Sequence, residues 1–150
     1  MDRKCGLSLI EVLMAVLLVS VLATVAIPAF TNFTKDARVQ VTKERMDVIK
    51  RAIVGDPRLV SNGQYVQPGY EAQVGALPGT LTDLVTICGT CSGYNVYTKT
   101  GWRGPYVSNV TGWNQDAWGQ SFTYSSGSRT LTSRGPDQTL GTSDDIIFTF

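Results

Sequence analysis

At 150 residues, the chain has room for one modest domain in addition to a long helix, and its 13 Lys and Arg residues nearly balance its 12 Asp and Glu residues. This balance argues against a protein built to bind nucleic acid, which would carry a strong basic excess. The sequence contains no histidine, so the commonest general base and the commonest metal ligand are both absent and an enzyme is disfavoured.

The first predicted element is one nearly continuous helix over residues 7–54, whose first half is apolar on every side, as a buried or membrane helix should be. Residues 12–34 carry no charge, and about 23 helical residues are enough to cross a hydrocarbon core roughly 30 Å thick. Glu11 stands at the start of this stretch. A carboxylate there costs roughly 2.5 kcal/mol or more unless it has a partner or lies near the membrane interface.

A short basic leader over residues 1–6 precedes the helix and ends in Gly6. If the chain were cut after Gly6, the new ammonium group of Leu7 would lie one helical turn from Glu11 and could pair with it in the same or a neighbouring chain. Cleavage therefore accounts for an otherwise costly acidic residue. A secretory signal peptide has a shorter apolar core, and a plain signal anchor leaves Gly6 and Glu11 unexplained.

The eight residues Gly-Leu-Ser-Leu-Ile-Glu-Val-Leu at positions 6–13 resemble the cleavage and assembly signal of type IV pilin-like proteins. The resemblance implies that a prepilin peptidase cuts after Gly6 and methylates the amino group of Leu7. It also implies that Glu11 guides docking into a filament. The chain departs from the commonest pattern in having Leu7 where Phe is usual and Ser8 where Thr is usual.

After residue 34 the helix becomes amphipathic, with one apolar face at helical spacing made by Val39, Thr42, Met46, Ile49 and Ile53. Gly55 is a good helix stop, and Pro57 prevents the helix from resuming. The next stretch, residues 56–112, signals little regular structure apart from a short helix over residues 81–85, with Thr80 as its N-cap and Asp83 completing a capping box.

From Trp118 onward the pattern is typical of β-structure, with alternation through Phe122 and Tyr124 and a turn at residues 126–127. Arg129–Ser133 is the predicted returning strand, and Ile146–Phe150 is the last strand. Three antiparallel strands packed on the amphipathic half-helix would bury its apolar face. The predicted fold is therefore α+β and pilin-like, with a leader over residues 1–6, a transmembrane or filament-core helix over residues 7–34 and a globular domain over residues 35–150.

The C-terminal half carries a second resemblance, to the major pseudopilins of type II secretion. Its segments are residues 77–78 and 81–85, residues 101–106 (Gly-Trp-Arg-Gly-Pro-Tyr), residues 116–124 (Asp-Ala-Trp-Gly-Gln-Ser-Phe-Thr-Tyr), and residues 133–137 and 141–146 of the last loop. Ala117 departs from that family, in which Pro is typical, and Cys88–Cys91 lies in what resembles an insertion. The resemblance implies a structural subunit that polymerises in a helical filament and helps to drive folded proteins across the outer membrane.

The last loop places Asp137, Asp144 and Asp145 close together in sequence among glycines and hydroxyl residues. Hard oxygen ligands on a flexible loop suit Ca²⁺, although the spacing is not that of an EF-hand. From the residues alone, a calcium site and a solvated acidic turn are equally good interpretations. The resemblance to the pseudopilins, whose corresponding loop binds calcium, favours the structural Ca²⁺ site.

Cys5 lies in the leader, which leaves Cys88 and Cys91 as a pair. A small structural disulfide is the favoured interpretation, and it is compatible with an oxidising compartment outside the inner membrane. A zinc site lacks further ligands in a chain without histidine, and catalytic redox chemistry lacks both a surrounding βαβ unit and an activating basic helix end.

Aromatic side chains are frequent in the second half, and they favour a core between the sheet and the helix over a carbohydrate-binding strip: Trp102, Tyr106, Trp113, Trp118, Phe122 and Tyr124.

The resemblances together imply a non-enzymatic pseudopilin, held by a single span in the bacterial inner membrane with its globular domain in the periplasm. The implied partners are copies of itself, the prepilin peptidase, the inner-membrane assembly platform, minor pseudopilins and, before assembly, membrane lipid; no nucleic acid is expected. A major or minor pilin of a type IV pilus, extracellular once assembled, remains an alternative. A membrane-anchored periplasmic enzyme or thiol oxidoreductase is the alternative from another class.

Overall fold

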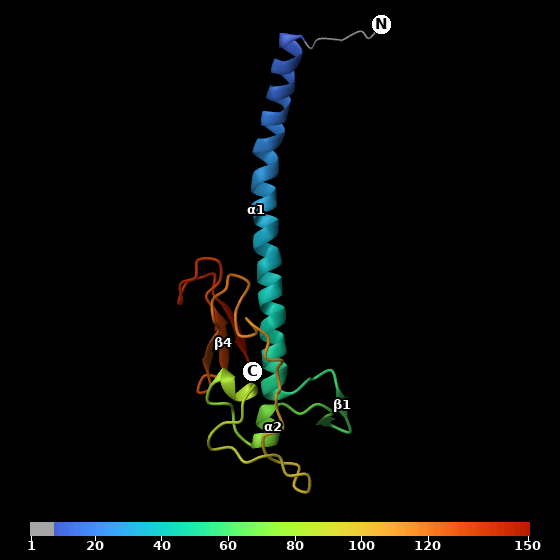
Figure 1. Ribbon diagram of the computed structural model, residues 1–150, viewed down its shortest axis with the longest axis vertical. Helices are drawn as coiled ribbons and strands as arrows, with labels where there is room; N and C mark the ends of the chain where they lie inside the picture. Colours follow the sequence, from blue (N-terminus) through green and yellow to red (C-terminus); the bar gives the residue numbers. More distant parts are fainter. Residues whose placement is uncertain (1–7) are drawn as a thin grey trace. The chain divides into compact units, whose positions relative to one another are not determined.

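The computed structural model describes residues 8–150, apart from the side chains of residues 25–29 and of Gln64 (Figure 1). The chain divides into two units, one that ends at Ala37 and one that covers Arg38–Phe150. A single α-helix, α1 (Leu9–Val54), belongs to both units. Its residues up to Ala37 lie in the first unit, and its remaining residues are the first element of the second unit. The predicted helix is confirmed from Leu9 onward, while Leu7 lies outside the described residues.

The part of α1 that belongs to the second unit is amphipathic, as predicted. Thr42, Met46, Ile49 and Ile53 are buried, and Val39 is half-buried. Burial of such a face, rather than helix propensity alone, is what stabilises most helices in folded proteins.

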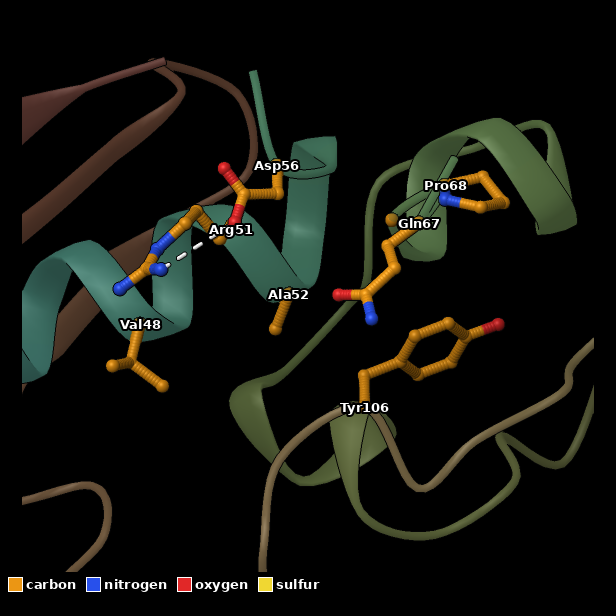
Figure 2. Close-up of a pocket in the computed structure, with 8 residues that line it drawn as sticks. Val48, Arg51, Ala52, Asp56, Gln67, Pro68 and Tyr106 are labelled. Carbon is orange, nitrogen blue, oxygen red and sulfur yellow. Dashed lines mark ion pairs between the residues drawn. The ribbon is translucent and has the colours of Figure 1, made fainter. Parts of the chain in front are cut away.

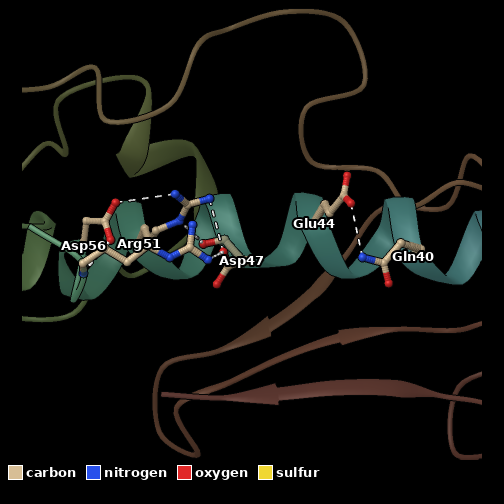
Figure 3. Close-up of polar contacts among 6 residues, drawn as sticks. Gln40, Glu44, Asp47, Arg51 and Asp56 are labelled. Carbon is tan, nitrogen blue, oxygen red and sulfur yellow. Dashed lines mark hydrogen bonds and ion pairs between the residues drawn. The ribbon is translucent and has the colours of Figure 1, made fainter.

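A row of polar side chains follows another face of this part of α1 (Figure 3). The amide of Gln40 donates a hydrogen bond to Glu44 (3.2 Å), and Arg51 forms ion pairs with Asp47 (3.2 Å) and Asp56 (3.5 Å). These side chains keep that face polar and hold the chain that leaves the helix close to its last turn.

The helix ends where predicted, at Gly55. This residue has φ +111°, a left-handed conformation that glycine adopts readily, and its amide donates a hydrogen bond to the carbonyl oxygen of Arg51 (2.8 Å). The chain then turns away from the helix axis.

A small hairpin follows, made of β1 (Val60–Ser61) and β2 (Gln64–Tyr65) in antiparallel register. Asn62 and Gly63 join the strands with φ values of 53° and 75°. Two consecutive left-handed residues make the turn that matches the twist of a tight hairpin, and Asn-Gly is its preferred sequence. This hairpin was not predicted from the sequence.

Two short helices come next. The first, α2 (Tyr70–Val74), ends at Gly75 and was not predicted. The second, η1 (Leu81–Leu84), lies where a helix over residues 81–85 was expected, but it is a 3₁₀ helix and is one residue shorter. Its predicted capping box is present: the amide of Thr80 donates to the Asp83 carboxylate (3.0 Å), and the Thr80 side chain is placed to accept from the backbone amide of Asp83.

The predicted three-stranded antiparallel sheet is confirmed, with the order β3 (Thr123–Ser125), β4 (Thr130–Ser133) and β5 (Ile146–Thr149). Its bounds differ from the prediction. The expected onset of strand at Trp118 is wrong, because a turn occupies residues 117–119 and β3 begins only at Thr123. The expected strand start at Arg129 is also wrong, because Arg129 has φ 52° and closes a four-residue turn.

The core of the second unit lies between α1 and this sheet, and Figure 1 shows β4 alongside the C-terminal half of α1. Met46, Ile49 and Ile53 of α1 share the core with Leu131 of β4 and with Phe122. Most of the aromatic residues named above join it, as the core interpretation predicted: Phe122 is buried, and Trp102, Tyr106, Trp113 and Tyr124 pack on the core while partly buried. The fold is α+β with a long N-terminal helix, as predicted.

Candidate functional site

The first half of α1 exposes consecutive apolar side chains, which on a helix point in all directions. Their exposed fractions run from 47% for Val12 to 79% for Leu9, and the set comprises Leu9, Ile10, Val12, Leu13, Met14, Val16, Leu17, Leu18, Val19, Val21 and Leu22. The hydroxyls of Ser20 and Thr24 donate to helix carbonyls one turn earlier, at 2.8 and 2.7 Å. This surface is therefore almost wholly apolar, and such surfaces mark sites of protein or lipid contact.

Glu11 is the exception on this surface. It lies exposed in the first turn of α1, where the partial positive charge of the helix N-terminus favours a carboxylate. Gly6 and Leu7, the predicted processing residues, lie outside the described residues together with the rest of the leader. The structure thus describes Glu11, the predicted assembly residue, but not its expected cationic partner, and the assembly role stays a prediction.

Within the described residues, no helix combines the length and the apolar character needed to cross a membrane. The span predicted over residues 7–34 includes Leu7 and the undescribed side chains of residues 25–29, and it stays a prediction.

The C-terminal acidic loop is built on a buried polar pair. Asp116 is 2% exposed, and one of its oxygens accepts the amides of Trp118 and Gln120, both at 2.9 Å. Its other oxygen accepts the hydroxyl of Ser133, the last residue of β4, at 2.7 Å. The Ser133 hydroxyl oxygen also accepts the amide of Gly135 (3.3 Å), so the loop leaves the sheet in a fixed direction.

The three predicted ligands lie in this loop, and each carboxylate accepts hydrogen bonds from loop donors. Asp137 accepts the amide of Thr139 (2.8 Å), and Asp145 accepts the amide of Gly141 (2.7 Å). Asp144 accepts the Thr142 hydroxyl (2.6 Å) and the amide of Asp137 (3.1 Å).

Those hydrogen bonds have an electrostatic consequence. The Thr142 hydroxyl, followed by the Asp137 amide, holds the pKa of Asp144 below its ordinary value, because both donors stabilise the charged form. The second oxygen of Asp145 is buried and has no partner among the described residues. An orphaned carboxylate oxygen is a free acceptor that a cation could satisfy.

The described part of the chain contains no group of three or more His, Cys, Asp or Glu side chains placed to hold a metal ion. Within the loop, the backbone amide of Asp137 donates to the Asp144 carboxylate, whereas the Asp145 carboxylate accepts from a different donor, the amide of Gly141. The oxygen-only donor set and the unpartnered oxygen of Asp145 suit Ca²⁺ in chemistry. The calcium site at Asp137, Asp144 and Asp145 stays a prediction.

Cys88 and Cys91 form a disulfide with their Cα atoms 5.2 Å apart. The sulfur of Cys91 lies 3.1 Å from the hydroxyl of Tyr70, a side chain of α2 that is 2% exposed. The disulfide therefore ties the loop after η1 to the core of the domain.

The structure also contains cavities that sequence reasoning did not find. One has a volume of about 310 Å³ and lies at the end of α1, lined in part by Arg51 and Asp56. Figure 2 shows the side chains of Gln67 and Tyr106 across this cavity from the helix. A larger one, of about 660 Å³, lies beside the β1–β2 hairpin and α2. Its polar lining comes from three separate segments of the chain, so no local sequence motif predicts this cavity.

Comparison with known families gives two matches. Residues 1–27 match the prokaryotic N-terminal methylation motif, and residues 30–148 match protein G of the type II secretion system. No curated protein and no solved structure matches the chain.

Proposed function

The chain belongs to the family of type II secretion system protein G and is a pseudopilin subunit of that system, and from this premise we propose how its residues serve assembly. The family is structural rather than enzymatic, and membership implies processing by a prepilin peptidase and assembly into a filament with other secretion components. The match to protein G favours secretion over a type IV pilus, which was the alternative from sequence.

The observation that carries the proposal is the apolar surface of α1 from Leu9 to Leu22. We propose that copies of this helix pack against one another in the core of a filament, because once the helix leaves the membrane such a surface would cost about 25 cal/mol for each Å² left exposed to water. Before assembly, lipid of the inner membrane covers the helix over residues 7–34, and the domain lies in the periplasm. The subunit is the major one and meets the assembly platform and minor pseudopilins on its way into the filament.

Glu11 sets the order of events in this proposal. Cleavage after Gly6 creates the ammonium group of Leu7, which pairs with Glu11 of a neighbouring subunit as the helix enters the filament. The pair neutralises the one charge on an apolar surface that is about to be buried. An unpaired carboxylate in that position is costly, so docking and cleavage depend on each other.

The C-terminal loop holds Ca²⁺ in this proposal, through Asp137, Asp144 and Asp145. Its support is the oxygen-only donor set and the unpartnered oxygen of Asp145. The ion would neutralise three like charges next to β5 and so keep the end of the sheet ordered.

Processing is tested by mass spectrometry of the N-terminal peptide from assembled filaments. We expect the chain to begin at Leu7 with a methylated amino group. Assembled material that keeps Met1 would contradict the proposed role of cleavage.

The pairing is tested with Glu11→Leu. This variant loses a charge from an apolar helix, so it should insert into membranes at least as well as the wild type. It should nevertheless enter sheared filaments poorly, at a small fraction of the wild-type yield in an immunoblot. Glu44→Leu, which removes an exposed carboxylate from the polar face of α1, is the matched control and should assemble. Normal filaments from Glu11→Leu would show that the carboxylate serves another purpose.

A further inference from the structure

The disulfide between Cys88 and Cys91 has two sulfurs in different surroundings. Cys91 packs against the core of the domain, and its sulfur lies 3.1 Å from the hydroxyl of Tyr70, a side chain that is 2% exposed. The sulfur of Cys88 instead has the hydroxyl of Thr90, an exposed residue, as its polar neighbour at 3.7 Å. Cys91 therefore lies on the core side of the bond, and Cys88 lies on its outer side.

Tyr70 is a hydrogen-bond donor to this bond. A disulfide sulfur carries no proton, so the phenol donates and the sulfur of Cys91 accepts. Burial raises the pKa of Tyr70, and the negative charge of Asp83 acts in the same direction, so the phenol keeps its proton. A proton donor is thus held in place beside the sulfur that would become a thiolate if the bond opened through attack on Cys88.

The other charge beside the bond is negative. A cavity of about 780 Å³ has both cysteines in its wall, and Asp83 is the one charged residue among the described residues that line it. The carboxylate of Asp83 is held by the amide of Thr80 (3.0 Å). A negative neighbour disfavours a second negative charge, so release of a thiolate here depends on the hydrogen bond from Tyr70.

The loop that carries the cysteines is also held by contacts other than the disulfide. The amide of Cys91 donates to the carbonyl of Cys88 (3.0 Å), which keeps the two residues in one turn. Beyond that turn, the amide of Trp102 donates to the carbonyl of Ser92 (2.9 Å), and its indole donates to the carbonyl of Asp83 (2.8 Å). Opening the bond therefore leaves both cysteines in place to close it again.

We propose that Cys88 is an exchange site for a small thiol, at which the disulfide opens and closes in the folded protein. The thiolate of the small molecule attacks the sulfur of Cys88 and forms a mixed disulfide there. The bond to Cys91 breaks, and its electron pair leaves with the sulfur of Cys91 as a thiolate, to which Tyr70 donates its hydrogen bond. Return of that thiolate to Cys88 expels the small thiol and restores the bond.

Complete opening takes a second small thiol. Its thiolate attacks the small-molecule sulfur of the mixed disulfide and releases Cys88. Two small thiols are then oxidised to one small-molecule disulfide, and their two electrons and two protons end on Cys88 and Cys91 as two thiols. The subunit is the substrate of this exchange and not its catalyst, so the exchange does not require the structural features of a thiol oxidoreductase.

The rate of thiol exchange depends on access to the attacked sulfur and on the stability of the departing thiolate. Both conditions favour attack on Cys88, which lies on the outer side and whose departing partner has the Tyr70 donor. Attack on Cys91 would approach the core side and would expel Cys88 without that donor. Because Cys88 is half-buried in a cavity wall, a small thiol reaches its sulfur more readily than a folded protein does.

The first test maps the site of attack. It uses the full chain in detergent micelles with Cys5→Ala, which leaves Cys88 and Cys91 as its only cysteines. The oxidised chain is exposed briefly to reduced glutathione without denaturant, quenched with N-ethylmaleimide and analysed by peptide mass spectrometry. We expect glutathione on Cys88 and maleimide on Cys91 at least about ten times as often as the reverse, as a difference in access and leaving group predicts.

The second test concerns the donor. Tyr70→Phe keeps the buried ring and removes the hydroxyl, so it should slow opening by glutathione about tenfold, as loss of one hydrogen bond to a charged group predicts. Tyr106→Phe is the matched control, because its ring lies 5.6 Å from that of Tyr70 and its hydroxyl donates to Gln73 instead; it should open at the wild-type rate. A purely structural role for Tyr70 would loosen the loop and speed opening.

A pH profile separates these two roles further. In the Cys88→Ser variant, the alkylation rate of Cys91 should rise at higher pH when Tyr70→Phe is added, and the added Tyr106→Phe should leave the profile unchanged.

Several results would overturn the proposal: glutathione on Cys91 as often as on Cys88, opening of Tyr70→Phe as fast as that of the wild type, or opening only in denaturant. A thioredoxin-type protein that opens the bond under conditions where glutathione does not would overturn the assignment to a small thiol.

Discussion

Tyr124 joins two parts of the domain through one side chain. Its ring stacks on Phe150 with the ring centres 6.2 Å apart, and its hydroxyl donates to the carbonyl oxygen of Pro78 (3.0 Å). Burial raises the pKa of Tyr124 to about 12, although the positive charge of Arg129 acts in the opposite direction. The folded state therefore holds the neutral phenol more firmly than the unfolded state does.

The raised pKa gives a pH dependence with a definite sign. Tyr124 contributes its full stabilisation below the ordinary pKa of 10.0, and that contribution is lost as the pH rises through about 12. We expect the thermal midpoint to fall between about pH 10 and pH 12, followed by circular dichroism. Tyr124→Phe should start lower, because the Pro78 carbonyl loses its donor, but should fall less steeply over this range. Equal slopes would mean that Tyr124 does not control alkaline unfolding.

Single residues differ in how much of their environment can be predicted from the sequence. Glu11 could be singled out because a charge in an apolar stretch is an anomaly that needs a cause, and its role in assembly stays a prediction. Gln73 could not be recognised as a buried residue, because glutamine is usually exposed, and only the structure shows its side chain 6% exposed with a hydrogen bond from the hydroxyl of Tyr106 (2.7 Å). The acidic loop is intermediate: its composition suggested a cation, while its internal hydrogen bonds appear only in the structure.

At the scale of elements, the sheet has two unlike faces, as strand alternation requires. Leu131 of β4 is fully buried and lies opposite Phe148 of β5, whereas the next pair in the register, Thr132 and Ile147, lies on the other face. Ile147 is 59% exposed although it is as apolar as Leu131. The register therefore decides which of the two contributes to stability.

Leu131→Ala should lower the free energy of unfolding by roughly 3 kcal/mol, because it leaves a cavity between the sheet and α1. Ile147→Ala is the matched control and should change stability by no more than about 0.5 kcal/mol, as is usual for exposed positions. Chemical denaturation of the full chain in detergent measures both. Similar effects of the two substitutions would contradict the register of β4 and β5.

Elements with a strong periodic or capping signal were predictable, and those fixed by tertiary contacts were not. The turn at Asn62 and Gly63 carried the preferred tight-hairpin sequence, and only the shortness of the flanking strands concealed it. The start of β4 could not be predicted. Arg129 lies outside the strand with φ 52°, and its guanidinium pairs with Glu71 of α2 (2.9 Å), a contact between residues 58 apart that a local pattern does not contain.

At the scale of the whole molecule, stability should depend on calcium. Binding of Ca²⁺ to the folded state alone stabilises it by RT ln(1 + [L]/Kd), and a Kd on the order of 10⁻⁴ M is sufficient outside the cytoplasm. We expect millimolar Ca²⁺ to raise the thermal midpoint of the full chain in detergent above its value in EDTA, and Mg²⁺ to have little effect.

Asp137→Ala should remove the difference between Ca²⁺ and EDTA. Asp36→Ala, which removes an exposed carboxylate from α1, is the control and should keep it. Equal midpoints for the wild type in Ca²⁺ and EDTA would leave the loop as a solvated acidic turn, held by its internal hydrogen bonds alone.

The contacts that close the domain also determine when it can fold. Arg45 of α1 donates to the carbonyl of Asp116, 71 residues later, and Lys50 donates to the carbonyl of Thr149, 99 residues later. A chain that emerges N-terminus first therefore presents the apolar face of α1 long before β4 and β5 exist to cover it. During that interval the nascent helix needs a temporary cover from a chaperone or a lipid surface. The order of synthesis, and not only the final contacts, therefore decides how long this apolar face stays uncovered.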